Sequence, residues 1–131
     1  MKVTFLRMLK TIDGYGIAEV LTPFGDATCL WKSRFTPIPN RSYEVEIEIK
    51  NQLVWGVNLK HCEAPSEVRF ESTTGSTLFA GKLEAVFEDG FCAIRIGDNL
   101  ITVQTQGLAV EIGTFVIGYA GHAAILFDSE T

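Results

Sequence analysis

The stretch "YEVEIEIK", residues 43–50, alternates apolar and charged side chains from its first residue to its last. Successive side chains of a β-strand point to opposite faces, so this period of two puts the apolar residues on one face and the charged residues on the other. The stretch therefore predicts a strand with one buried and one solvated face, and the rest of the chain can be compared with it.

Short segments of the same kind recur along the whole chain. They are rich in β-branched and aromatic residues and are bounded by turn-forming residues at intervals of about ten, which is typical of an all-β protein. The best candidate for a helix is a single turn at "LKHCEA", residues 59–64. We therefore predict an all-β fold of about twelve short antiparallel strands. The clearest further strands are "VRFES" (68–72), "KLEAVFE" (82–88), "FCAIRI" (91–96), "LITVQ" (100–104) and "TFVIGY" (114–119), and the turn signals include "TPFGD" (22–26), "KNQ" (50–52), "EDG" (88–90) and "GDN" (97–99).

The two halves of the chain resemble each other weakly when the sequence is shifted by 65 residues. Nine positions then carry the same residue, where composition alone would give roughly four. We interpret this as a possible internal repeat of residues 1–65 and 66–131. The coincident pairs are Val3/Val68, Phe5/Phe70, Gly16/Gly81, Glu19/Glu84, Gly25/Gly90, Val45/Val110, Glu46/Glu111, Ile47/Ile112 and Gly56/Gly121.

The repeat suggests an architecture for the strands. Each half is expected to form a small β-meander of the kind found in barrels that bind oligonucleotides or oligosaccharides. A half of this length buries only about 60 % of its unfolded surface, so the two halves are expected to pack together as one compact unit, residues 1–131. A single β-sandwich built from the same strands is the alternative.

Charge is divided unevenly between the halves. The 131 residues carry a net charge of −5; residues 1–65 hold eight Lys or Arg against seven Asp or Glu, and residues 66–131 hold three against nine. The first half is therefore +1 and the second half −6. An acidic second half suits a basic partner, whereas the first half, which also holds both tryptophans, is the more suitable face for nucleic acid.

Cellular location is inferred from the lack of targeting features. No run of about 18 apolar residues predicts a membrane span, and no signal-peptide core is recognisable at the start of the sequence. We expect a cytoplasmic protein that does not act at a membrane. Its three cysteines, Cys29, Cys62 and Cys92, are scattered, and this favours reduced thiols over a disulfide framework.

The stretch Trp31–Phe35, "WKSRF", offers the most suggestive contact residues. Aromatic rings beside cations can stack bases and hold phosphates, so Lys32 and Arg34, with Arg41 and Trp55, are candidate binding residues. Strand alternation, however, sends Trp31 and Phe35 to one face and the two cations to the other. The stretch can thus be either a nucleic-acid contact or a hairpin whose apolar ends point inward.

Catalytic and metal-binding patterns are weak. His61-Cys62-Glu63 is the one local cluster of metal-ligand types, and no second pair of ligands completes it, so neither a metal nor a cofactor is expected. His122, in the apolar context "YAGHAAILF", is a candidate for a small-molecule site at a barrel mouth. No nucleophile stands in a recognisable catalytic setting, and no catalytic residue is assigned; the sequence favours a protein without catalytic activity over an enzyme.

These observations lead to one expected function and two alternatives. The expected function is a non-catalytic β-barrel module that engages a protein partner, for instance a basic one, or that self-associates. The first alternative is a barrel that binds single-stranded nucleic acid through the basic, Trp-containing first half. The second is a small-molecule-binding barrel, or an enzyme whose site is not visible in the sequence.

Overall fold

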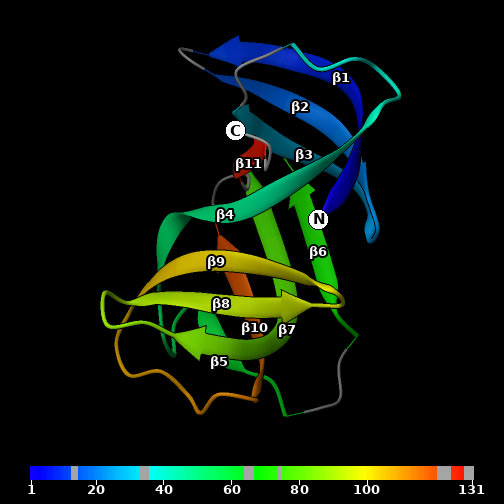
Figure 1. Ribbon diagram of the computed structural model, residues 1–131. Helices are drawn as coiled ribbons and strands as arrows, with labels where there is room; N and C mark the ends of the chain where they lie inside the picture. Colours follow the sequence, from blue (N-terminus) through cyan, green and yellow to red (C-terminus); the bar gives the residue numbers. More distant parts are fainter. Residues whose placement is uncertain (13–14, 33–35, 64–66, 74, 121–124, 129–131) are drawn as a thin grey trace.

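The computed structural model shows an all-β protein in which every regular element is a strand (Figure 1). It describes residues 1–12, 15–32, 36–63, 67–73, 75–120 and 125–128. The strands are β1 (Lys2–Ile12), β2 (Tyr15–Thr22), β3 (Gly25–Lys32), β4 (Ser42–Val54), β5 (Leu59–His61), β6 (Arg69–Thr73), β7 (Ser76–Val86), β8 (Phe91–Ile96), β9 (Asn99–Gln106), β10 (Phe115–Ala120) and β11 (Ile125–Asp128). No helix among the described residues is long and apolar enough to cross a membrane.

The eleven strands belong to one sheet, which is not closed as a whole. Their order is β1-β2-β3-β11-β4-β9-β8-β7-β10-β5, β6 pairs with β7, and β1 also pairs with β4. Two of the pairings, β3 with β11 and β4 with β9, are parallel. The expectation of a wholly antiparallel fold was therefore wrong. Tight turns make sequence neighbours antiparallel, but strands brought together from distant parts of a chain can pair in either direction.

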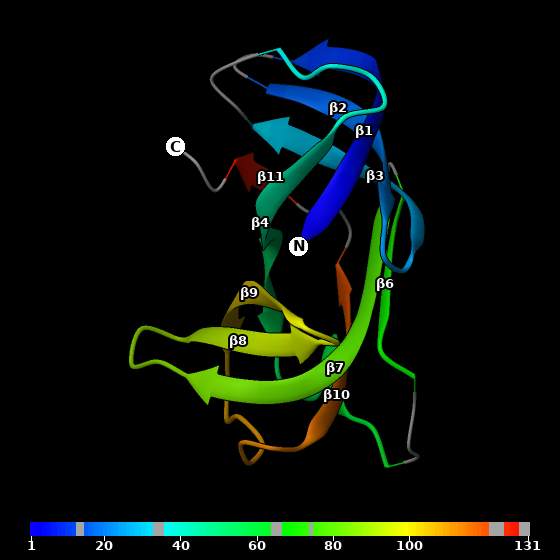
Figure 2. The same ribbon diagram turned by 45° about the vertical axis from the view of Figure 1, so that its right-hand side comes forward.

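The strands gather in two lobes (Figures 1 and 2). Lobe 1 holds β1, β2, β3, β11 and the first part of β4; lobe 2 holds β5, β7, β8, β9, β10 and the last part of β4. Strand β4 joins the lobes because it pairs with β1 and β11 near its start and with β9 further along. Strand β6 runs from lobe 2 toward β3, where the Ser72 hydroxyl donates a hydrogen bond of 2.7 Å to the carbonyl oxygen of Thr28.

The alternation of residues 43–50 is confirmed in β4. Val45, Ile47 and Ile49 are buried in the hydrophobic core, whereas Glu44 and Glu46 are exposed. The strand does not end at the predicted turn "KNQ" but continues to Val54. The pairing with β9 shifts register between Ile49 and Leu53, so the polar residues of this segment occupy an irregularity within the strand rather than a turn.

One local prediction in lobe 2 was wrong. Residues 59–61 of the candidate helical turn at 59–64 instead form β5, which pairs with β10, and beyond it the backbone N–H of Cys62 donates to the carbonyl oxygen of Phe115. A segment this short gains more from completing a ladder with β10 than from one isolated helical turn, which is costly to nucleate. Residues 108–114 precede β10 and are not part of a strand, although "VEI" at 110–112 repeats the letters of a strand segment in β4.

Candidate functional site

The structure does not bring the candidate binding residues together. Arg34 and His122 lie outside the described residues. Lys32 is exposed at the end of β3, and Arg41 is exposed just before β4, with its carbonyl oxygen accepting a hydrogen bond from the backbone N–H of Phe5. Both are in lobe 1, whereas Trp55 follows the end of β4 in lobe 2.

Trp31 is a core residue. It is 4 % exposed. The rings of Phe5 and Tyr43 pack edge to face against it, and the centroid of each lies 5.5 Å from the centroid of the Trp31 ring. The neighbouring Lys32 is exposed, so residues 31 and 32 follow the strand alternation expected from the sequence. A ring enclosed in this way offers no face on which a base can stack.

Trp55 forms part of the wall of a hollow in lobe 2. The hollow has a volume of about 390 Å³. The indole is 9 % exposed and is held in place because its Nε1 donates to the Thr105 hydroxyl at 3.2 Å, while its backbone N–H donates to the carbonyl oxygen of Gln106 at 2.9 Å. The lining residues are Trp55, Gly56, Leu59, Lys60, His61, Leu108 and Val110.

Two turns with glycine shape this hollow. Gly56 follows Trp55 with φ of +85°, and Gly107 follows β9 with φ of +98°, a conformation that other residues rarely adopt. A Cβ on Gly107 would lie 3.6 Å from the Cβ of Trp55. The chain leaving β9 therefore passes close to Trp55 and carries Leu108 to the hollow.

Large apolar side chains stand in solvent on the segments that form this hollow. Leu108 is 92 % exposed, Val57 66 % and Ile112 64 %, the three highest values for large hydrophobic residues in the described part of the chain. Val57 is adjacent to Gly56 in the turn, and Ile112 lies two residues beyond Val110. We call Val57, Leu108 and Ile112 the apolar rim. Leu108 itself lines the hollow, and Val57 and Ile112 lie on the segments that supply its other lining residues, so exposed apolar side chains accompany a hollow, as at binding surfaces.

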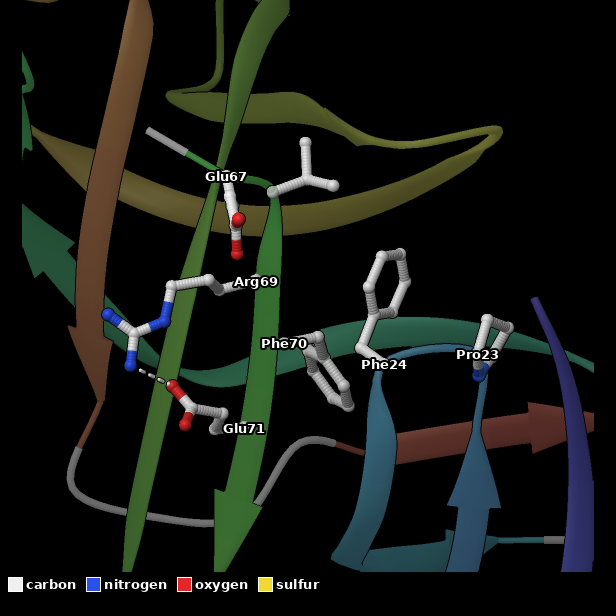
Figure 3. A pocket seen from close by; sticks show the side chains of 7 residues that line it. Pro23, Phe24, Glu67, Arg69, Phe70 and Glu71 are labelled. Carbon is white, nitrogen blue, oxygen red and sulfur yellow. Dashed lines mark hydrogen bonds and ion pairs between the residues drawn. The ribbon is translucent and has the colours of Figure 1, made fainter. Parts of the chain in front are cut away.

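A second hollow of about 360 Å³ lies between β6 and the turn that joins β2 to β3 (Figure 3). Arg69 and Glu71 extend to one side of β6, where they form an ion pair, and Phe70 points to the other side, toward Phe24. Side chains from both faces of β6 line the hollow, so it lies along the edge of this strand. Its lining residues are Pro23, Phe24, Glu67, Val68, Arg69, Phe70 and Glu71.

Carboxylates predominate around Phe24. Glu67 and Glu71 line the hollow itself, and Arg69 is its one lysine or arginine among the described lining residues. On the other side, a Cβ on Gly97 would lie 3.4 Å from Phe24 Cζ, so the exposed Asp98 that follows Gly97 is also close. The sequence pointed only to a turn at "TPFGD"; the phenylalanine within that turn was the signal that could have drawn attention to this surface.

Catalytic chemistry finds no support in the buried thiols. Burial raises the pKa of Cys29 to about 12, against a hydrogen bond from Ser72 that lowers it. Burial likewise raises the pKa of Cys92. Both thiols are therefore protonated near neutral pH, the unreactive form. Within the described residues, no group of three or more His, Cys, Asp or Glu side chains is placed to hold a metal ion.

Comparison of the chain with models of known protein families, with curated proteins and with solved structures finds no match.

Proposed function

We propose that the chain is a non-catalytic binding module that engages a protein partner through the hollow beside Trp55. The observation that carries this proposal is the apolar rim, above all Leu108 with 92 % of its side chain in solvent. Protein interfaces are centred on aromatic and apolar side chains that a partner removes from water. The hollow has this composition, because Trp55 and the exposed Leu108 both line it.

The charge of the chain indicates what kind of partner would approach. The described lining of the hollow holds Lys60 and no carboxylate, whereas the whole chain carries a net charge of −5, to which residues 66–131 contribute −6. Such a field accelerates the encounter with a basic protein and repels an acidic one, and salt weakens the effect. The partner we propose is therefore a protein with a basic surface; a second copy of this chain is the other occupant that the apolar rim would accept.

Substitution of Leu108 tests the proposal. We expect Leu108→Ser to weaken partner binding by about tenfold or more, because the leucine loses the free energy of burial in the interface. The fold should be unaffected, since the side chain is already in solvent. Leu21→Ser, at an exposed leucine of β2 in lobe 1, is the matched control.

Two measurements on these variants identify the partner. Light scattering after size-exclusion chromatography reports self-association, and quantitative capture from a cell extract at low salt reports other proteins. Particle mass or capture that depends on Leu108 and not on Leu21 supports the proposal. Identical behaviour of the wild type and both variants would overturn it.

A second candidate function is binding of single-stranded nucleic acid by lobe 1. The strand order favours it, because the pairing of β1 with β4 returns β1-β2-β3-β11-β4 to its first strand. We propose that these five strands are a small barrel of the oligonucleotide- or oligosaccharide-binding type. Exposed Arg7 and Lys10 on β1 add to Lys32 and Arg41. Burial of both tryptophans weighs against it, since neither offers a stacking face.

The two candidates respond differently to an oligonucleotide. A module that binds protein should ignore a random single-stranded oligonucleotide in the same light-scattering experiment at low salt. A larger particle that forms with the oligonucleotide and dissociates at high salt would favour the lobe 1 barrel, because phosphate contacts are strongly salt-dependent.

A further inference from the structure

We infer that the edge of β6 beside Phe24 binds an extended segment of a partner protein as an added β-strand, and that this segment carries lysine or arginine. The inference rests on the proposed function as a protein-binding module, but it concerns a different surface from the hollow beside Trp55. Three observations carry it: an unpaired strand edge, a hollow along that edge and an excess of carboxylates around it.

The first observation is the edge itself. Among the described residues, β6 pairs with no strand other than β7. The hairpin closes at the pair Thr73–Ser76, so alternate residues of β6 exchange backbone hydrogen bonds with β7. By this alternation the backbone groups of Phe70 point away from β7, and Val68 lies directly before the first paired residue, Arg69. An edge of this kind is a template on which an extended peptide can pair.

The second observation is the space beside the edge. Near its end β6 is joined to β3 by the hydrogen bond from Ser72 to Thr28, and further back the hollow of about 360 Å³ separates it from Pro23 and Phe24. A proline has no backbone N–H, so the opposite wall offers less for a peptide backbone to pair with. An inserted segment would pair with β6 and lay its side chains against Phe24.

The third observation is charge. Glu67 and Glu71 line the hollow, Asp98 lies beyond Phe24, and Arg69 already pairs with Glu71. A cation on the incoming segment therefore meets the carboxylates of Glu67 and Glu71 in the hollow, with Asp98 one residue from Gly97, which lies near the Phe24 ring. A cation close to an aromatic face is itself attracted to the ring. An acidic segment would meet like charges, so the structure selects a basic one.

Synthetic peptides test the inference on the whole chain. The probe is a short, fluorescently labelled peptide in which lysine alternates with valine, and its binding is followed by fluorescence anisotropy. The matched peptide has glutamate in place of lysine. A third peptide keeps the lysines but is N-methylated at alternate residues, which removes the backbone donors needed for strand pairing. We expect binding of the first peptide only.

Three variants locate the binding on this edge. Val68→Pro removes a backbone N–H in the lining of the hollow, directly before the first paired residue of β6, and we expect a loss of about tenfold or more in affinity. Phe24→Ala should cost about five- to tenfold through the lost ring. Glu67→Gln should cost about two- to fivefold and reduce the salt dependence. Glu88→Gln, at an exposed glutamate outside the hollow, is the control and should bind as the wild type does.

The outcomes separate this inference from the proposed function. Binding of the lysine peptide that Leu108→Ser leaves intact and Val68→Pro removes supports the β6 edge. Equal binding of all three peptides, or binding unchanged in both Val68→Pro and Phe24→Ala, would overturn it. Such a failure would leave the proposed function of the hollow beside Trp55 untouched, because that proposal is tested separately with Leu108→Ser. Thermal unfolding of each variant verifies that lost binding does not reflect lost folding.

Discussion

The hairpins β2–β3 and β7–β8 occupy corresponding places in the two halves of the chain. Ile17 pairs with Leu30, and 65 residues later Lys82 pairs with Arg95 in the same register, until an irregularity between Leu83 and Ala85 shifts the second hairpin by one residue. The strand before each hairpin does not keep this correspondence. Phe5 pairs with Val20, whereas Phe70 pairs with Phe79, six residues before Ala85, which is the counterpart of Val20. Similar letters thus accompany the same pairing over two residue pairs of each hairpin but a different attachment of the neighbouring strand. Whether the halves share an origin stays a prediction.

The same contrast appears in two glycines that coincide in the sequence. A Cβ on Gly16 would lie 2.2 Å from the sulfur of Met8, the flexible end of an exposed side chain. A Cβ on Gly81 would lie 2.2 Å from the carbonyl oxygen of Arg95, which belongs to the backbone of β8. The Met8 side chain beside Gly16 can move aside, whereas the Arg95 backbone beside Gly81 is fixed in the sheet.

The largest effect that this comparison predicts is therefore on folding stability. We expect Gly81→Ala to lower the free energy of unfolding by about 1–3 kcal/mol, because the new methyl group displaces the backbone of a paired strand. Gly16→Ala should cost less than about 1 kcal/mol, since Met8 can rotate away. Urea-induced unfolding of both variants measures the difference. Equal losses would show that the two sites are alike in rigidity.

At neutral pH the buried thiols, one in each hairpin, have a smaller effect, which grows only in alkali. Burial raises the pKa of Cys29 to about 12 from an ordinary value of 9.0, and it also raises the pKa of Cys92. The folded state thus retains a proton that the unfolded chain loses above pH 9. Stability that is fully present below pH 9 should fall as the pH rises from there toward 12, by at most about 1.4 kcal/mol per pH unit for each thiol.

Cys29→Ala measures the contribution of this thiol. The variant should show a shallower loss of stability between pH 9 and pH 11 than the wild type, whatever its stability at pH 7. Denaturant unfolding at several pH values gives the slopes. Parallel slopes for the wild type and the variant would contradict a strongly raised pKa for Cys29.

The smallest effect is expected at two ion pairs whose glutamates, Glu19 and Glu84, coincide in the shifted sequence while their arginine partners do not. Glu84 accepts two hydrogen bonds from Arg95, at 3.1 and 3.3 Å, across β7 and β8. Glu19 accepts one from Arg7, at 3.4 Å, across β1 and β2. A two-point contact of an arginine with a carboxylate is the better defined of the two. Glu84→Gln should therefore reduce stability more than Glu19→Gln, with both losses small because solvent screens these groups.

The loss of folding stability at acid pH measures the contribution of the stronger pair, Glu84 and Arg95, directly. The hydrogen bond from Arg95, together with its charge, lowers the pKa of Glu84 below 4.5. This contribution to stability is present above that ordinary value and is lost as the pH falls through the lowered one. Glu84→Gln should flatten the fall in stability below pH 4.5. An acid limb identical to that of the wild type would show that the pair contributes nothing.

Part of the candidate site could be predicted from the sequence. Trp55 was a candidate because of its residue type, and it does line a hollow. The sequence did not predict the hollow itself or the exposed Leu108 beside it. Leu108 lies 53 residues further along the chain and reaches the hollow through the turn at Gly107. Phe24 was counted only as part of a turn. Nothing in the letters of residues 67–71 shows which backbone edge a neighbouring strand will leave unpaired.

What the sequence determined by itself was the all-β class and the alternation of buried and exposed residues along β4. Both depend on a period of two that each strand carries locally, and burial of one face is enough to enforce it. Tertiary structure alone decided the parallel pairings of β3 with β11 and of β4 with β9, the conversion of residues 59–61 from a candidate helical turn to a strand, and the two hollows. These depend on contacts between residues far apart in the chain, whose free energy no local pattern records.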